Sequence, residues 1–232
     1  MPYFEVNFDP FIALGKITNS PVSNPLNLLS SVESVGAAGI SFTYGPETGQ
    51  MNNVTLLRSM TNCRINIRVP ADMQVLQKAI LLRPDIVTLC DMEREDTTVQ
   101  IPSKSIKELV NSVLNTEDLG IAIRLKPDGK QLKEAYQMGI DEIEIATNEL
   151  ARHDKQVPFL ECLEKITHTI HVGIKNNLRI SAGGELDRRL IRALNEVIDV
   201  EFISVGKALL SKSLMWGLEN TLKEFNEVID IR

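Results

Sequence analysis

The chain has 232 residues, of which 43% are hydrophobic, and its 25 basic and 31 acidic side chains give a formal net charge of −6 at pH 7. This length is enough for one large hydrophobic core, and a mildly acidic chain without a long basic run is not expected to bind nucleic acid or an anionic membrane. We expect a cytoplasmic protein, because no apolar run reaches the roughly 18 to 20 residues of a membrane span and the N-terminus has no signal-peptide layout.

Short β-branched or apolar runs alternate with segments of helical periodicity along the chain. The runs predict strands at residues 3–8, 39–44, 63–69, 85–90, 120–126, 141–146, 177–182 and 201–206. The segments between them predict helices at residues 25–37, 52–60, 72–82, 102–116, 129–138, 156–171, 186–196 and 208–228. Eight consecutive βα units predict an α/β fold with a single TIM (β/α)8 barrel domain over residues 1–232. An open doubly wound sheet is the competing fold, but no glycine-rich fingerprint follows the first strand.

Residue types that start and end helices support these boundaries. N-cap or first-turn residues stand at Asn24, Pro25, Asp72, Pro102 and Asp128. Glycines that suit the left-handed backbone at a helix end stand at Gly36, Gly39 and Gly139.

An arginine interrupts the buried alternation of the third strand, where Ile65, Ile67 and Val69 precede or flank Arg68. In a barrel the active site forms where the strands end and the βα loops begin, so Arg68 is expected at the floor of a pocket. It is either a cation that serves a ligand or a reaction, or an inward-pointing charge that a neighbouring carboxylate neutralises. Asp9 and Glu144 are the expected partners in the second case.

Other reactive groups at the strand ends each have an ordinary structural interpretation. The fifth strand ends with Arg124 and Lys126, of which we single out Lys126 as a possible Schiff-base amine or a simple charge partner. Cys90 is a possible nucleophile or a small buried side chain, and no histidine is expected close enough to activate it. With Cys63 and Cys162 it makes three widely spaced cysteines, which suggest reduced thiols rather than disulfides or a zinc site.

The three histidines lie away from the strand ends. His153 falls in the sixth βα loop, and His168 and His171 lie late in the following helix, where positive charge complements the helix dipole. Two histidines without a third ligand do not make a metal site, so we predict neither a metal nor a cofactor.

The seventh and eighth strand ends carry the segments "SAGG" and "SVGK", in the loops that most often bind phosphate in barrels. The candidate phosphate ligands in these segments are Ser181, Gly183, Gly184, Gly206 and Lys207. The same glycines also suit tight strand exits. Glu185 lies beside the proposed cradle, where it would repel a phosphate or take its place.

From residue 3 to about 228, the chain resembles the pyridoxine 5′-phosphate synthases, barrel enzymes of vitamin B6 biosynthesis. The resemblance is carried by six segments in the family's order, "VNFDPFIAL", "GAAGISFTY", "INIRV", "EREDTT", "IEIAT" and "RISAGGEL". It implies a barrel that condenses 1-deoxy-xylulose 5-phosphate with an amino-oxopropyl phosphate, and a ring-like homo-oligomer.

Most of the family's catalytic groups are replaced at the matching positions. The resemblance implies a general acid/base glutamate at Arg68 and an aspartate at Lys126. It implies histidines or an arginine where this chain has Pro10, Thr43, Gly45, Ala146 and Gly184, and a further histidine near Gln50. Residues that keep the family's scaffold and polar lining are Asn7, Asp9, Asn66, Thr97, Thr98, Glu144, Thr147 and Gly183. The match at the eighth strand is ambiguous, and one alignment removes Gly206 and Lys207 from the phosphate cradle.

Three functions follow from this pattern. In the first, the chain is a synthase-like barrel that binds a small anionic or phosphorylated metabolite, and the condensation is absent or strongly reduced because several acid/base groups are lost together. In the second, it is a repurposed enzyme of the sugar-phosphate lyase or aldolase type, with Arg68 and Lys126 as anion clamps and Asp9 or Glu144 as base. In the third, it is an active synthase with displaced catalytic groups.

Overall fold

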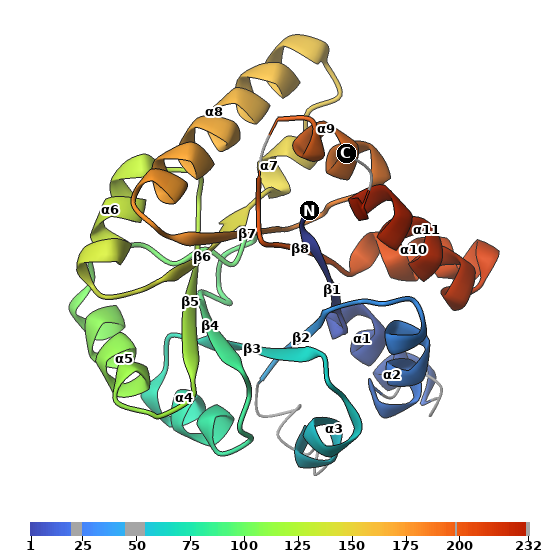
Figure 1. The fold of residues 1–232 in the computed structure, drawn as a ribbon, viewed down its shortest axis with the longest axis horizontal. Coiled ribbons are helices and arrows are strands. Elements are labelled where there is room, and N and C mark those ends of the chain that lie inside the picture. The colour runs from blue at the N-terminus through green and yellow to red at the C-terminus, as the bar shows by residue number, and fades with distance from the viewer. Residues whose placement is uncertain (20–24, 45–53, 198, 231–232) are drawn as a thin grey trace.

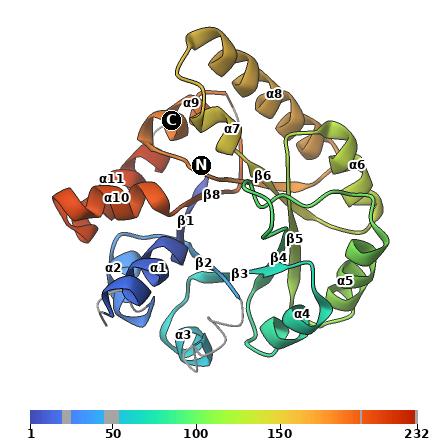
Figure 2. The ribbon, with the colours of Figure 1, turned by 180° about the vertical axis from the view of Figure 1, so that it is seen from behind.

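The computed structural model describes residues 1–19, 25–44, 54–197 and 199–230. Its strands form one closed, parallel barrel in chain order, and helices surround the barrel on all sides (Figures 1 and 2). The predicted TIM barrel is therefore confirmed. The strands are β1 (Tyr3–Asn7), β2 (Gly39–Thr43), β3 (Arg64–Pro70), β4 (Ile86–Cys90), β5 (Gly120–Leu125), β6 (Glu142–Ala146), β7 (Arg179–Gly183) and β8 (Phe202–Val205).

Most helices begin and end within a few residues of their predicted bounds. These are α2 (Pro25–Ser34), α3 (Val54–Met60), α4 (Met73–Ile80), α5 (Lys104–Leu114), α6 (Gly129–Gln137), α8 (Gln156–Lys175) and α9 (Arg188–Asn195). Two helices at the strand exits were not predicted, α1 (Asp9–Thr18) and the single turn α7 (Asn148–Ala151). The last predicted helix is two helices, α10 (Lys207–Trp216) and α11 (Leu218–Asp230), because Gly217 adopts a left-handed φ of 78° between them.

Capping side chains fix several helix starts. The carboxylate of Asp72 accepts a hydrogen bond from the Val75 amide at 2.9 Å, and that of Asp128 accepts one from the Lys130 amide at 2.9 Å. Ser103, rather than Pro102, is the N-cap of α5. The Asn24 prediction lies outside the described residues.

Two of the three predicted glycine helix ends are confirmed. Gly36 and Gly139 have φ values of 78° and 81°. The prediction for Gly39 was wrong, because this residue begins β2, where its extended backbone pairs with β1 and β3.

The side chains of each strand alternate between the helices and the barrel interior. On β3, Ile65, Ile67 and Val69 are fully buried in the core between sheet and helices. Arg64 and Arg68 point into the barrel interior, where they form hydrogen bonds to residues of β6 and β8. Branched aliphatic residues usually fill a barrel of this kind. Here its interior is largely polar and charged.

The lower end of the interior is closed by an ion-pair cluster. Arg64 binds both carboxylate oxygens of Glu142, at 3.0 and 2.7 Å, and its guanidinium lies 3.9 Å from the centre of the Phe202 ring. Glu5 lies 3.9 Å from the same guanidinium. This cluster leaves the opposite end, where the strands finish, as the open mouth of the barrel.

A glycine allows α8 to pack closely on β7. A Cβ atom at Gly173 would lie 2.6 Å from Ile180 Cδ1 and 3.0 Å from Leu132 Cδ2, and both of these side chains are buried. Only a residue without a side chain fits here without moving the helix.

Replacing Gly173 by alanine is expected to lower the free energy of unfolding by about 1–3 kcal/mol, because the added methyl group overpacks the interface. This loss should appear although alanine favours a helix by about 1 kcal/mol over glycine. Urea denaturation measures it.

Gly129→Ala is the matched control, since its Cβ would meet Val172 at an ordinary 3.7 Å. The control should be neutral or stabilising. Equal effects of the two substitutions would contradict the close-packing argument.

Candidate functional site

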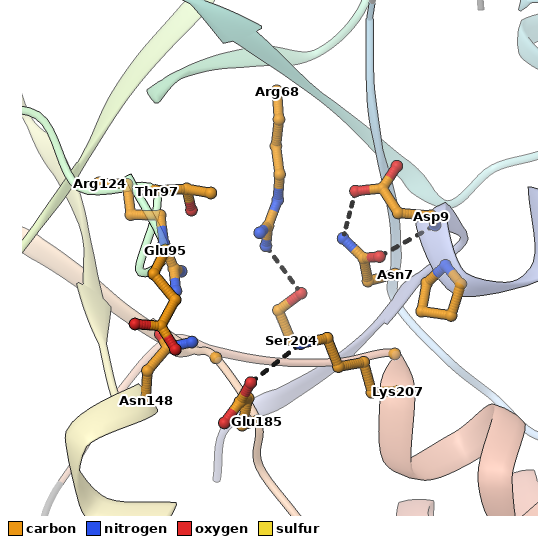
Figure 3. Close-up of a pocket in the computed structure, with 13 residues that line it drawn as sticks. Asn7, Asp9, Arg68, Glu95, Thr97, Arg124, Asn148, Glu185, Ser204 and Lys207 are labelled. Carbon is orange, nitrogen blue, oxygen red and sulfur yellow. Dashed lines mark hydrogen bonds and ion pairs between the residues drawn. The ribbon is translucent and has the colours of Figure 1, made fainter. Parts of the chain in front are cut away.

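A pocket of about 180 Å³ opens at the mouth of the barrel (Figure 3). Its walls come from the ends of β1, β3, β5 and β8 and from the loops that follow β4, β6 and β7. The lining residues are Asn7, Asp9, Pro10, Arg68, Glu95, Thr97, Arg124, Asn148, Gly184, Glu185, Ser204, Gly206 and Lys207. The pocket thus gathers segments that are far apart in the sequence, and seven of the candidate site residues are among them.

Arg68 reaches into the pocket from β3, as its position at the strand end predicted. Its Nη2 atom donates to Glu144 Oε1 at 3.0 Å and to Ser204 Oγ at 3.1 Å (Figure 3 shows the second bond). Burial alone lowers the pKa of the guanidinium, but Glu144 and other nearby anions outweigh burial and raise the pKa above its usual value. Arg68 is therefore a fixed cation, and its carboxylate partner is Glu144 rather than Asp9.

Glu144 is shared by two arginines. Besides Arg68, the Nη1 atom of Arg124 contacts the same oxygen, Oε1. The side chains of Arg124 and Glu144 are almost completely buried. Burial raises the pKa of Glu144, but the charges of Arg68 and Arg124 more than offset this and hold the pKa below its usual value. A carboxylate held ionised in this way is a weak proton acceptor, which argues against Glu144 as a general base.

The sequence prediction singled out Lys126 and passed over Arg124. Lys126 lies one residue past the end of β5, is half-exposed, and pairs with Asp96 at 3.1 Å. It lines a separate hollow of about 210 Å³ beside the pocket. Arg124 is the fifth strand's contribution to the pocket, and its signal in the sequence was the same as that of Arg68, a charge within a run of buried aliphatic residues.

Asp9 lies on the β1 side of the pocket, at the start of α1. Its carboxylate accepts hydrogen bonds from the amide of Thr43 at 2.6 Å, from the Thr43 hydroxyl at 2.8 Å and from Asn7 Nδ2 at 3.3 Å. These bonds tie the ends of β1 and β2 together. They also occupy much of the capacity of Asp9 to accept hydrogen bonds from a ligand.

The seventh and eighth loops meet at the pocket rim. Gly184 and Gly206 line the pocket, and Lys207 there pairs with Glu185 at 2.9 Å (Figure 3). Gly184 adopts a φ of 118°, and a Cβ atom on it would collide with Asn148 and Arg124. These contacts give Gly184 a packing role in addition to any role in anion binding.

The remaining candidates lie beneath or beside the pocket. Asn66 is buried deeper in the barrel, between Glu5 and Thr88, at 3.2 and 2.8 Å. Thr98 donates to Asp96 at 2.8 Å behind the fourth loop, while Thr97 lines the pocket with a left-handed φ of 53°. Two more candidates are buried on β7, Ser181 in the middle of the strand and Gly183 at its end. Pocket residues that the sequence analysis did not select as ligands are Pro10, Glu95, Arg124, Asn148, Glu185 and Ser204.

The cysteines match their structural interpretation. All three are unpaired and buried. Burial raises the pKa of Cys90 to about 12, so its thiol is protonated at neutral pH and is not an activated nucleophile. Among the described residues, no group of three or more His, Cys, Asp or Glu could hold a metal ion. None of the helices in the described part of the chain is long and apolar enough to cross a membrane.

Comparison with known proteins gives a consistent family match. The model of the pyridoxal phosphate biosynthesis protein PdxJ family matches residues 4–231. Pyridoxine 5′-phosphate synthase from Geobacter metallireducens is 26% identical over 234 residues, with 97% of each chain covered. The enzyme of the same name from Prochlorococcus marinus is 24% identical over 237 residues, with 97% of this chain and 94% of the relative covered.

Solved structures share the fold at lower identity. The 3-keto-L-gulonate-6-phosphate decarboxylase of Vibrio cholerae superposes with a TM-score of 0.67 at 16% identity, covering 99% of this chain and 97% of that one. A 3-hexulose-6-phosphate synthase superposes with a TM-score of 0.60 at 13% identity, covering 98% and 99%. At this identity the likeness concerns the barrel fold.

Replacing Glu144 by glutamine is expected to lower the free energy of unfolding at pH 7 by about 3–5 kcal/mol, because two buried arginines lose their shared counter-charge. The loss should depend on pH. Folding lowers the pKa of Glu144 below its usual value of 4.5, so the ionised carboxylate contributes its full stabilisation at pH values above 4.5. This contribution is lost as the pH falls from 4.5 through the lowered pKa. The difference between the two proteins in urea denaturation should therefore shrink only below about pH 4.5.

Glu219→Gln is the control, because Glu219 forms an exposed ion pair with Lys223 at 2.8 Å. Its removal should leave stability nearly unchanged. If Glu144→Gln were as mild as this control, the shared buried carboxylate would not be an important source of stability.

Proposed function

Because the chain belongs to the family of the pyridoxal phosphate biosynthesis protein PdxJ, we propose that it uses the family's barrel to bind a small anionic or phosphorylated metabolite, with the condensation activity absent or strongly reduced. We further propose that it works in the cytoplasm as a single-domain barrel and assembles into a homo-oligomer. Free buried thiols support a reducing compartment, and the exposed apolar side chains of Leu214, Met215 and Trp216 on α10 support self-association.

The main support for lost condensation activity is the fixed charge of Arg68. The sequence resemblance implies a glutamate acid/base at this position, and Arg68 cannot exchange a proton near neutral pH. Glu144, the carboxylate next to it, is held ionised by two guanidiniums. Among the described residues that line the pocket, none is histidine, cysteine or tyrosine. The described lining thus has few groups suited to repeated proton transfer at neutral pH.

Anion binding is supported by the guanidinium groups at the pocket floor. Arg68 and Arg124 share the carboxylate of Glu144, and Arg68 also lies 3.9 Å from Glu5, but these contacts do not use all the N–H donors of the two arginines. The Nε atom of Arg68 is buried, and among the described residues it has no hydrogen-bond partner. Neutral donors surround this floor in the amides of Asn7 and Asn148. Guanidinium groups flanked by neutral donors suit a carboxylate or phosphate.

The size of the pocket also favours a small ligand. Its volume of about 180 Å³ is below the roughly 300–1,000 Å³ typical of sites for drug-sized molecules. Two of the similar barrels carry names that refer to sugar phosphates, 3-keto-L-gulonate-6-phosphate and 3-hexulose-6-phosphate. A compact phosphorylated metabolite is therefore the ligand class that we propose.

The alternative of a repurposed lyase or aldolase-type enzyme requires one change. Lys126 pairs with Asp96 outside the pocket, so Arg68 and Arg124 would be the anion clamp. Asp9 would be the base, since it is the less buried of the two proposed carboxylates. Its carboxylate already accepts three hydrogen bonds from Thr43 and Asn7, which hold it at the wall of the pocket.

The gene is expected not to rescue the growth of a bacterial strain that lacks its pyridoxine 5′-phosphate synthase. The reason is the simultaneous loss of the acid/base positions, each of which typically contributes about 10² to 10⁴ in rate. Growth without added vitamin B6 is the measurement, with a functional synthase gene as positive control and immunoblotting to confirm expression. Rescue would establish an active synthase with displaced catalytic groups.

Inorganic phosphate and a triose phosphate at millimolar concentration are expected to raise the melting temperature of the purified protein, because a ligand that binds only the folded state stabilises it by mass action. Arg68→Gln should reduce this ligand-dependent shift by at least the equivalent of a tenfold loss of affinity. Differential scanning fluorimetry at matched ionic strength measures both effects.

Arg94→Gln is the control for charge, because Arg94 pairs with Asp91 at 3.4 Å and does not line the pocket. It should retain the full shift. Anion binding in the pocket is refuted if the wild-type protein shows no shift, and the role of Arg68 is refuted if both variants behave alike.

A further inference from the structure

An ion pair spans the rim of the pocket between its seventh and eighth loops. Lys207 is the first residue of α10, and its Nζ atom lies 2.9 Å from Glu185 Oε1 (Figure 3). Both residues line the pocket with Arg68 and Ser204. Lys207 is the only cation besides Arg68 and Arg124 in the described lining, and a carboxylate of the chain itself already neutralises it.

The backbone holds Glu185 in an unusual conformation. Its φ is 55°, in the left-handed region that a residue with a side chain rarely adopts, and it follows Gly184 at 118°. The surroundings fix both residues, because the Thr147 hydroxyl donates to the Gly184 carbonyl at 2.7 Å and Asp187 caps α9 through the Leu190 amide at 2.8 Å. Strained backbone that is fixed from both sides is characteristic of ligand-binding positions.

We propose that Glu185 is a built-in competitor for the ligand: its carboxylate occupies the place beside Lys207 that a ligand anion would take, and binding requires this ion pair to open. The proposal rests on the proposed function, since it concerns the same pocket. It assigns Glu185 a role in setting the affinity of the pocket for an anion.

The exposure of the pair makes such competition feasible. The Lys207 side chain is 72% exposed and that of Glu185 is 36% exposed, so water screens their attraction and the pair opens at small cost. The Glu144 pairs below are almost fully buried and stay closed. A doubly charged phosphate gains more from Lys207 than the single charge of Glu185 does, whereas a monocarboxylate gains no advantage. The pocket should therefore prefer phosphate to a monocarboxylate.

The test measures the binding of inorganic phosphate and of acetate by calorimetry, in wild-type protein and in Glu185→Gln. The glutamine keeps the shape of the side chain and removes its charge. Its dissociation constant for phosphate should fall about five- to tenfold, as expected for losing one partly screened like charge near the ligand. Acetate should gain less than phosphate, because the lost repulsion and the released Lys207 act on one ligand charge instead of two.

Two further proteins separate competition for Lys207 from a general change of charge. Glu219→Gln removes the same charge from an exposed ion pair outside the pocket and should bind phosphate like the wild type. In a protein that already carries Lys207→Gln, adding Glu185→Gln should increase phosphate affinity by less than half as much as it does in the wild type. The reason is that Lys207, which Glu185→Gln would free for the ligand, is no longer present. Circular dichroism confirms that all variants are folded.

Each result decides between the two proposals. Phosphate binding by the wild type without a gain in Glu185→Gln overturns the competitor role and leaves the proposed function standing. An undiminished gain in the Lys207→Gln background also overturns it, because repulsion alone would then explain the effect. Binding by Glu185→Gln alone supports the competitor and contradicts phosphate binding by the chain as it stands. Absence of binding in every protein overturns both proposals.

Discussion

The structure depends on the neutralisation of charges that the strands place inside the barrel. Three acidic and three basic side chains point into the described interior, Glu5, Glu142, Glu144, Arg64, Arg68 and Arg124. Because an unpaired buried charge costs several kcal/mol, each of these residues depends on partners from other strands of the barrel. The pairs therefore specify which strand ends face one another. Close packing adds a second constraint, since a Cβ atom at Gly183 would lie 2.5 Å from Glu144 Oε1.

The same charge network limits the chemistry at the mouth. Arg68 and Arg124 keep Glu144 ionised, whereas burial keeps the Cys90 thiol protonated. Charge pairing at Glu144 and burial at Cys90 thus move the pKa values of these groups away from the range in which a side chain gains and loses a proton at neutral pH. A barrel interior organised in this way provides fixed charges and hydrogen-bond donors. Such groups suit the proposed binding of an anion better than repeated proton transfer.

The fold was more predictable from the sequence than the site was. Alternation of buried and polar residues located all eight strands, and it also marked Arg68 as an inward charge. It did not separate Arg124 from Lys126, because the alternation places both side chains on the same face of an extended strand. In the structure β5 ends at Leu125, and Lys126 pairs with Asp96 outside the pocket. The break at Gly217 depends on a local left-handed turn within a helical pattern. The pairing of Glu185 with Lys207 joins two loops 22 residues apart, and no local pattern encodes it.

The network separates a rigid floor from an adjustable rim. Pairs on the floor are buried, so a change in one of them leaves a charge without compensation and affects the stability of the whole barrel. The rim pair of Glu185 and Lys207 is screened by water, and changing it alters the local potential with little effect on folding. Substitutions at the rim can therefore change which ligand binds while the barrel persists.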